Sequence, residues 1–167
     1  MRVDSDILPA TDIESLSVDL AEAVLRRIAP SEIPRLRAAA RRHFAGPSRR
    51  PDRRTAFAAD DTRLTPYVLT AAVPVVQYLA AALAAHYARR TGEIVAGRVR
   101  GIIRGTEMGS GEAVLTARQI GQVRHLTRRH AMSAGGTEDL ATALSDAVAE
   151  SLADPRPAER GPTPPDP

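Results

Sequence analysis

Apolar residues recur along most of this chain at intervals of three and four positions, which is the spacing of a helix that buries one face. The first such run follows a capping box, Thr11-Asp-Ile-Glu14, and Pro30 ends it. Its apolar positions are Ile13, Leu16, Leu20, Val24 and Ile28. These signals predict a first helix from Thr11 to the residues just before Pro30.

A second helical run follows between residues 31 and 46. Ser31 is its expected cap, and Pro34 lies in the first turn, where the missing N–H of proline costs nothing. Residues 1–45 are therefore predicted to form a pair of helices. The next segment, 46–64, has no periodicity and combines arginines, prolines and a glycine, so it is predicted to be an Arg/Pro-rich linker.

The third run is the most apolar part of the chain, with no Asp, Glu or Arg between Thr65 and Ala88. Thr65 followed by proline is typical of a helix start, and the helix is expected to reach Arg90. Gly92 offers a C-cap or a kink. Beyond it the apolar positions of a basic amphipathic helix are Ile94, Val95, Val99, Ile102 and Ile103. Residues 65–105 are thus predicted to hold a central apolar helix and a basic helix.

The last periodic region, 116–153, is predicted to be a helical hairpin. It opens with a second capping box, Thr116 to Gln119, and Gly135–Gly136 divides it. We assign its apolar positions as docking residues for a partner protein: Ile120, Val123, Leu140, Leu144 and Val148. The Pro-rich tail, 154–167, is expected to be disordered. Since no strand alternation occurs, the fold class is all-α: a small bundle of about five to six helices with one long apolar central helix.

The central helix has two interpretations. Val68 to Ala85 is long enough to cross a bilayer, and Tyr67 and Tyr87, about 30 Å apart along a helix, have the placement of interfacial aromatic residues. The span would comprise Val68, Val73, Val76, Leu79 and Leu83, with Tyr67, Tyr87, Arg89 and Arg90 at its interfaces.

Other features of the same stretch favour a soluble bundle. Gln77 lies at its centre, alanine is its commonest residue, and both flanks are basic, so the distribution of charges gives no membrane orientation. A helix that is apolar all round is also typical of a bundle centre. A third interpretation is contact with a membrane surface through the basic segment 94–104.

Composition excludes several kinds of chemistry. The chain of 167 residues has no Cys, so it forms no disulfide and no Cys-based zinc site. All 23 basic residues are Arg, and without Lys there is neither a Schiff base nor a P-loop phosphate site. No apolar leader follows the acidic N-terminus. The expected location is intracellular, either cytoplasmic or associated with the cytoplasmic membrane, and not secreted.

Charge is distributed in blocks although the net charge is only +3. Residues 1–34 carry 3 Arg and 7 acids, residues 35–104 carry 14 Arg and 4 acids, and residues 131–167 carry 2 Arg and 7 acids. Such blocks indicate an interaction surface or pairing between parts of the chain.

The densest basic stretch, residues 35–54, is our candidate for contact with an anionic partner, either nucleic acid or lipid head groups. The arginines assigned to this surface are Arg41, Arg42, Arg49, Arg50, Arg53 and Arg54. Phe44 is its one aromatic residue, so base stacking is scarce. The acidic helix after Gly136 would be repelled by phosphate, which favours a protein partner for the hairpin.

No catalytic constellation is recognised. The four histidines are His43, His86, His125 and His130, and the last two are five positions apart, whereas two zinc ligands on one helix face are four apart. The Gly-rich stretch 105–114 lacks the spacing of a phosphate loop, and its acids would repel phosphate. We therefore assign no catalytic, cofactor-binding or metal-binding residue and expect a protein that is not an enzyme.

Three stretches carry a resemblance: "APSEIPRLRAAARRHFAGP", "LTPYVLTAAVPVVQYLAAALA" and "LTARQIGQVRHLTRRHAMSAGGTEDLATALSDAVAESL". Their order over residues 28–153 resembles a loose group of small uncharacterised actinobacterial helical proteins. The resemblance implies a shared helical architecture and a GC-rich actinobacterial source, and it transfers no activity.

Two functional expectations follow. The first is a membrane-associated adaptor or an accessory or regulatory subunit of a larger system, which binds a protein partner. The alternative is a soluble helical bundle that binds protein or nucleic acid through its Arg-rich 35–54 segment, and salt-dependent binding of nucleic acid would favour it. A protein partner is favoured over a nucleic acid. Contact with an anionic membrane surface, or with further copies of the chain, is compatible with either functional expectation.

Overall fold

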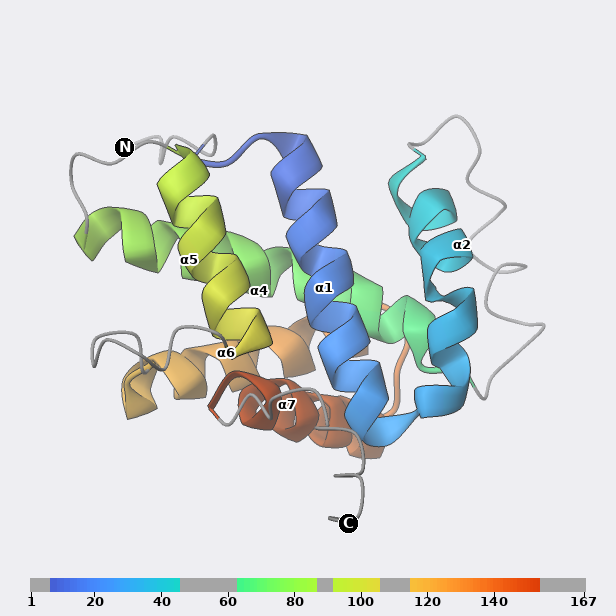
Figure 1. Cartoon of the computed structure of the whole chain (residues 1–167). Helices are drawn as coiled ribbons and strands as arrows, with labels where there is room; N and C mark the ends of the chain where they lie inside the picture. Colours follow the sequence, from blue (N-terminus) through green and yellow to red (C-terminus); the bar gives the residue numbers. More distant parts are fainter. Residues whose placement is uncertain (1–6, 46–62, 87–91, 106–114, 154–167) are drawn as a thin grey trace, which may run out of the picture.

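The computed structural model describes residues 7–45, 63–86, 92–105 and 115–153, and every regular element within these ranges is helical (Figure 1). This confirms the all-α fold class and the single long apolar helix. In chain order the elements are α1 (Ala10–Ile28), the 3₁₀ turn η1 (Pro30–Glu32), α2 (Ile33–Phe44), α4 (Thr65–His86), α5 (Gly92–Arg104), α6 (Ala117–Ser133) and α7 (Glu138–Ala153). The predicted tail and most of the predicted linker lie outside the described residues.

Helix α4 lies in the centre of the bundle, and α1, α2, α5 and α6 all contact it. Figure 1 shows α4 passing behind α1 and α5, with α6 and α7 below and α2 beside its N-terminal end. The largest fully buried side chains come from five of the six helices and include Leu16, Leu20, Leu36, Leu69, Val75, Leu79, Val99 and Leu144. The core is therefore aliphatic, and α4 supplies its middle.

The capping box predicted at Thr11 does not form. Helix α1 begins at Ala10, and the N-cap position lies at Pro9, two residues before Thr11, with no side-chain cap. The Pro9 carbonyl accepts the N–H groups of Asp12 and Ile13, so Thr11 is already inside the first turn and its hydroxyl has no capping role. The predicted end of the helix is confirmed, because α1 stops at Ile28, before the turn that Pro30 opens.

Helix α2 also begins differently from the prediction. Ser31 lies in η1 and does not cap, whereas Glu32 is the residue before the helix, and Pro34 lies in the first turn as expected. The Glu32 carboxylate is used elsewhere: it accepts the backbone N–H groups of Leu64 and Thr65, each at 2.9 Å, and the hydroxyl of Thr65. The N-terminus of α4 is thus capped by a side chain from the start of α2.

The ionised form of Glu32 is favoured by these contacts. Burial raises its pKa, but the N–H donors of Leu64 and Thr65, the Thr65 hydroxyl and the charge of Arg63 outweigh burial and hold the pKa below the ordinary value of 4.5. Glu32 therefore joins two helices whose N-terminal residues are separated by about thirty positions in the sequence.

Helix α5 begins at Gly92, which sits close to the first described segment. A Cβ at this position would lie 3.0 Å from the carbonyl oxygen of Ile7, so glycine permits the approach. The predicted apolar face needs one correction: Val95, Val99, Ile102 and Ile103 are buried, but Ile94 is 41% exposed. Ile94 lies in the first turn of the helix, before α5 packs closely on its neighbours.

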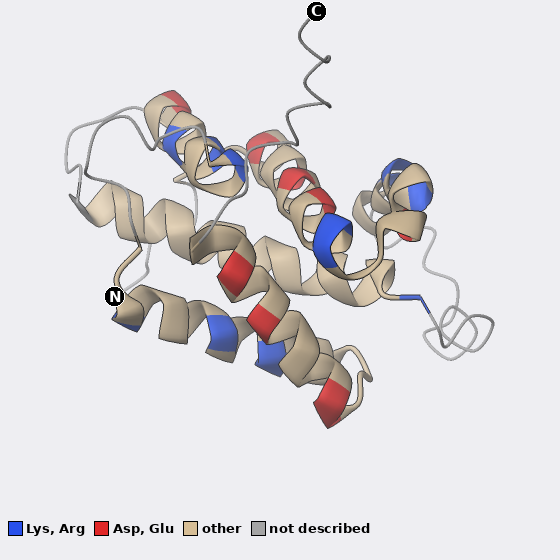
Figure 2. Cartoon of the chain, turned by 60° about the horizontal axis from the view of Figure 1, so that its bottom comes forward, with Lys and Arg blue, Asp and Glu red and all other residues tan. Residues whose placement is uncertain are grey.

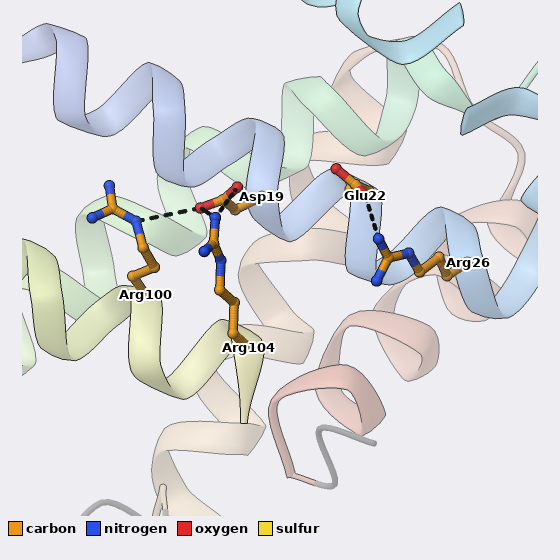
Figure 3. A network of polar contacts seen from close by, with 5 residues as sticks. All are labelled: Asp19, Glu22, Arg26, Arg100 and Arg104. Atoms are coloured by element: carbon orange, nitrogen blue, oxygen red, sulfur yellow. Dashed lines mark hydrogen bonds and ion pairs between the residues drawn. The ribbon is translucent and has the colours of Figure 1, made fainter. Parts of the chain in front are cut away.

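The acidic first block and the basic middle of the chain meet at Asp19 of α1. Figure 3 shows Arg100 and Arg104 of α5 reaching its carboxylate, at 3.5 Å and 3.2 Å. In the same view Glu22 pairs with Arg26 within α1. The charge blocks are therefore partly an intramolecular match.

The C-terminal hairpin forms as predicted. Thr116 caps α6 through the backbone N–H of Gln119, and the Gln119 side chain accepts the N–H of Thr116, which completes the capping box. Gly135, at a φ of 93°, supplies the left-handed turn. The backbone at Gly136 passes so close to Ala131 that a Cβ would lie 2.9 Å from its carbonyl oxygen.

Candidate partner-binding surfaces

The residues assigned to a membrane span lie mostly inside the protein. Val68, Val76 and Leu79 are at most 2% exposed and Tyr67 is 8% exposed, while Val73 and Leu83 are half-buried. Tyr87, Arg89 and Arg90 lie outside the described residues. Thr65–Ala85 has a mean hydropathy of 1.9 and would cross a bilayer by length and composition, and 44% of its most apolar window is buried. In this fold the same side chains serve as the core.

The opposite face of α4 is uncharged and only partly covered. Pro66, Thr70, Val73 and Pro74 are half-buried along it, and Gln77 is exposed. The polar residue at the centre of the apolar stretch thus faces outward, where its amide can be solvated. This arrangement fits a bundle helix with one face toward water.

The apolar residues assigned to partner docking on the hairpin also belong to the core. Val123, Leu144 and Val148 are at most 2% exposed, and Ile120 and Leu140 pack against the core from its edge. The assignment is corrected accordingly: these side chains hold α6 and α7 on the bundle.

The acids of α7 are largely neutralised within the chain. Asp146 pairs with Arg124 of α6 at 3.3 Å, Glu138 pairs with Arg128 of α6, and Glu150 lies 3.8 Å from Arg27 of α1. Figure 2 shows the acidic face of α7 alongside the basic face of α6. These acids of α7 therefore have their basic partners inside the same molecule.

Helix α2 is a basic surface whose charges no described residue neutralises. Arg35, Arg37, Arg41 and Arg42 are all exposed, and the helix contains no acid (Figure 2). Within the described part of the chain none of these four arginines forms an ion pair. Of the arginines assigned from the sequence, Arg41 and Arg42 lie on this exposed surface, and the remaining four, Arg49, Arg50, Arg53 and Arg54, lie outside the described residues.

A groove of about 540 Å³ separates α2 from α1. The two helices meet at η1 and diverge from there, as Figure 1 shows. The α1 wall consists of Thr11, Glu14, Ser15 and Val18. The α2 wall consists of Arg37, Ala40, Arg41, Phe44 and Ala45. Sequence reasoning missed this groove, because the spacing within each helix does not tell how far apart two helices lie.

The histidines do not converge on a site. His43 stands edge-on to Phe44, with ring centroids 5.0 Å apart, and burial together with the charge of Arg129 lowers the pKa of His130. The side chain of His86 lies outside the description. Among the described residues, no group of three or more His, Asp or Glu side chains is placed to hold a metal ion.

Comparison with protein-family models, with curated proteins and with solved structures found no match to this chain. The resemblance to actinobacterial helical proteins accordingly stays an expectation from the sequence. What the chain does has to be argued from its own surfaces.

Proposed function

We propose that this protein is a non-enzymatic helical interaction protein, an adaptor or accessory subunit, that binds an anionic partner through α2. The observation that carries the proposal is the row of exposed arginines on α2, which no described residue neutralises. The charges of α5, α6 and α7 are instead met largely by partners within the fold. Unneutralised positive charge on one short helix attracts and orients an anionic surface.

A protein partner suits this surface better than a nucleic acid. Phe44 is the one aromatic residue of α2 and is half-buried, so it offers little area for stacking on a base. The neighbouring helix α1 carries Asp12 and Glu14 in the half nearest the groove, and these acids would repel a phosphate chain. An acidic protein surface can avoid them because it can place carboxylates opposite α2 and neutral or cationic groups opposite α1.

Membrane association is the second candidate, and the apolar stretch Thr65–Ala85 favours it. Insertion would require Val68, Val76 and Leu79 to leave their contacts in the core. An alkaline carbonate wash of cell membranes separates the alternatives. Release into the supernatant supports the folded bundle as the working form, and retention until detergent is added supports insertion of α4.

Site-specific photo-crosslinking in cells tests the main proposal. A photoreactive amino acid replaces Ala45 at the exposed end of α2 in one variant and Ala143 on the exposed face of α7 in another. Both positions are alanines outside the core, which makes the pair matched. We expect discrete protein adducts from position 45 only.

The charge dependence of the adduct completes the test. Reversing both charges in Arg41→Glu/Arg42→Glu should abolish it while the thermal unfolding curve stays unchanged, because both side chains are exposed. Raising the salt concentration should weaken it too. Equal crosslinking from positions 45 and 143, or an adduct that survives charge reversal, would contradict the proposal.

A further inference from the structure

We propose that the groove between α1 and α2 binds a peptide segment of the partner protein, one that carries an apolar anchor residue with acidic side chains beside it. This inference rests on the function proposed above and names the chemistry of the partner. It comes from three features of the groove: an apolar floor, a basic wall and an opposite wall of hydroxyl groups and one carboxylate.

The floor of the groove is apolar and incompletely covered. Val18 of α1 and Phe44 of α2 are both half-buried, and Ala40, which also lines the groove, is 5% exposed. An aliphatic or aromatic side chain entering here would remove the remaining apolar surface of Val18 and Phe44 from water. Anchors of this kind carry most of the binding energy in protein interfaces.

The α2 wall presents two positive charges above this floor. Arg37 and Arg41 are four positions apart, so they lie on the same face of the helix, one turn from each other. Both side chains are exposed, and neither forms an ion pair with a described residue. A guanidinium group binds a carboxylate with two parallel hydrogen bonds, which favours Asp or Glu on the peptide next to the anchor.

The α1 wall of the groove favours a peptide over a nucleic acid as the ligand. Glu14 stands there with the hydroxyl groups of Thr11 and Ser15. Among the described residues no ion pair joins Glu14 to Arg37 or Arg41, so the two walls keep opposite charges apart across the groove. A peptide can place carboxylates on one side and N–H or cationic donors on the other, whereas a polynucleotide is anionic on both sides.

The openness of the groove argues against a small molecule. Small-molecule sites bury most of their ligand within a cavity. Here the groove is wide open to solvent, so a small ligand would keep much of its surface in water. A peptide, by contrast, can continue beyond the groove at both ends.

A random peptide library displayed on phage tests the inference with the full chain as bait. We expect enrichment of peptides in which one or two acidic residues flank an apolar or aromatic residue. The selected peptide, synthesised with a fluorescent label, then gives a dissociation constant by anisotropy. This probe is defined chemically and needs no knowledge of the natural partner.

Two pairs of charge reversals test whether the basic wall of the groove holds the peptide. Arg37→Glu/Arg41→Glu should weaken peptide binding at least about tenfold, since it removes both carboxylate contacts. The control, Arg118→Glu/Arg129→Glu, makes the same charge change at exposed positions of α6 that do not line the groove, and it should leave most of the affinity. Both variants should unfold at the temperature of the unchanged chain.

A steric variant tests the floor independently of charge. Ser15 is exposed and lines the groove, so Ser15→Trp should block the anchor pocket without disturbing the core. We expect it to abolish binding of the selected peptide.

Several outcomes would overturn the inference. Equal losses of affinity from the two charge reversals, or unchanged peptide binding by Ser15→Trp, would show that the peptide does not bind in the groove. Displacement of the peptide by a DNA duplex would indicate a nucleic acid as ligand. A dimer in sedimentation would indicate that a second copy of the chain occupies the groove. Peptide binding seen only after residues 46–62 are replaced by a Gly/Ser segment would assign the groove to the chain itself. Crosslinked protein adducts at position 45 would still support the proposed function in each of these cases.

Discussion

Helices α2 and α6 have the same charge composition in different surroundings. Each carries four arginines and no acid. In α6, Arg124 and Arg128 pair with acids of α7, whereas no arginine of α2 pairs with a described residue. The charge of a helix therefore does not by itself identify a binding surface. The neighbouring helix decides whether that charge is left for a partner.

The two helices also differ in how they are attached. Helix α6 contacts α4 and α7 along its length and starts with a complete capping box. Helix α2 has two buried residues, Leu36 and Ala40, and starts without a side-chain cap. A thinly anchored helix exposes more of its circumference, which suits a contact surface and makes each of its few anchors important.

The largest expected effect comes from that anchor. Leu36 is 1% exposed and is the one large side chain that α2 buries fully. Leu36→Ala should lower the free energy of unfolding by about 2–5 kcal/mol, because it removes buried carbons and leaves a cavity. Urea unfolding followed by circular dichroism measures the change. The exposed neighbour Arg35→Ala serves as control and should stay within about 0.5 kcal/mol of the unchanged chain; similar losses in both would show that α2 is not held by Leu36.

The next effect concerns the link from the start of α2 to α4. Glu32→Gln should destabilise the protein by about 1.5–3 kcal/mol at neutral pH, because a charged acceptor of three hydrogen bonds is replaced by a neutral amide. Urea unfolding at a series of pH values measures it.

The pH dependence of this difference has a definite sign. The folded-state pKa of Glu32 lies below 4.5, so its stabilisation is fully present above that pH and is lost as the pH falls through the lowered folded value. The gap in stability between the unchanged chain and Glu32→Gln should therefore narrow in acid. A gap that is constant or widens would contradict the role assigned to the carboxylate.

A smaller difference in stability is expected between substitutions at the starts of α6 and α2. Thr116→Ala should cost about 1 kcal/mol, because Thr116 caps α6 through a backbone N–H. The matched change Ser31→Ala, at the position expected to cap α2, should cost almost nothing, since Ser31 lies in η1 and makes no cap. Thermal unfolding of both variants checks the pair, and equal shifts would mean that Ser31 does contribute to the start of α2.

The smallest expected change in stability comes from reversing single surface charges on α6 and α2. Arg124→Glu places a negative charge beside Asp146, and both side chains are about half exposed, so the loss of stability should be below about 1 kcal/mol. Arg42→Glu on α2 should change stability even less, because no described partner is lost. Partner binding should show the reverse order, with the larger loss from Arg42→Glu, and crosslinking from position 45 measures it.

Features decided by neighbouring residues were predicted well from the sequence. The helices lie close to where the periodicity placed them, and the box at Thr116–Gln119 forms because its two members are three residues apart. The matching box at Thr11 failed on an equally local detail, since the N-cap position lies at Pro9, two residues before Thr11. A motif of four residues does not include the residue two positions before it, and here that residue decided the start.

Contacts between residues far apart in the sequence could not be predicted from local sequence patterns. Nothing near Glu32 indicates that it caps α4, because the partner groups at Leu64 and Thr65 are more than thirty positions away. The burial of Val123 and Leu144 and the exposure of Ile94 were likewise not predicted correctly, since an amphipathic pattern marks an apolar face without saying what covers it.

The sequence by itself determined an all-helical chain with one uncharged central helix and alternating blocks of charge, because helix formation and composition depend on residues close together in the chain. Only the tertiary structure decided that Asp19 pairs with two arginines of α5, that acids of α7 pair with two arginines of α6, and that α2 keeps its positive charge beside a partly apolar groove. Charge pairing and grooves depend on distances across the fold, and those distances are set by how the helices pack around α4.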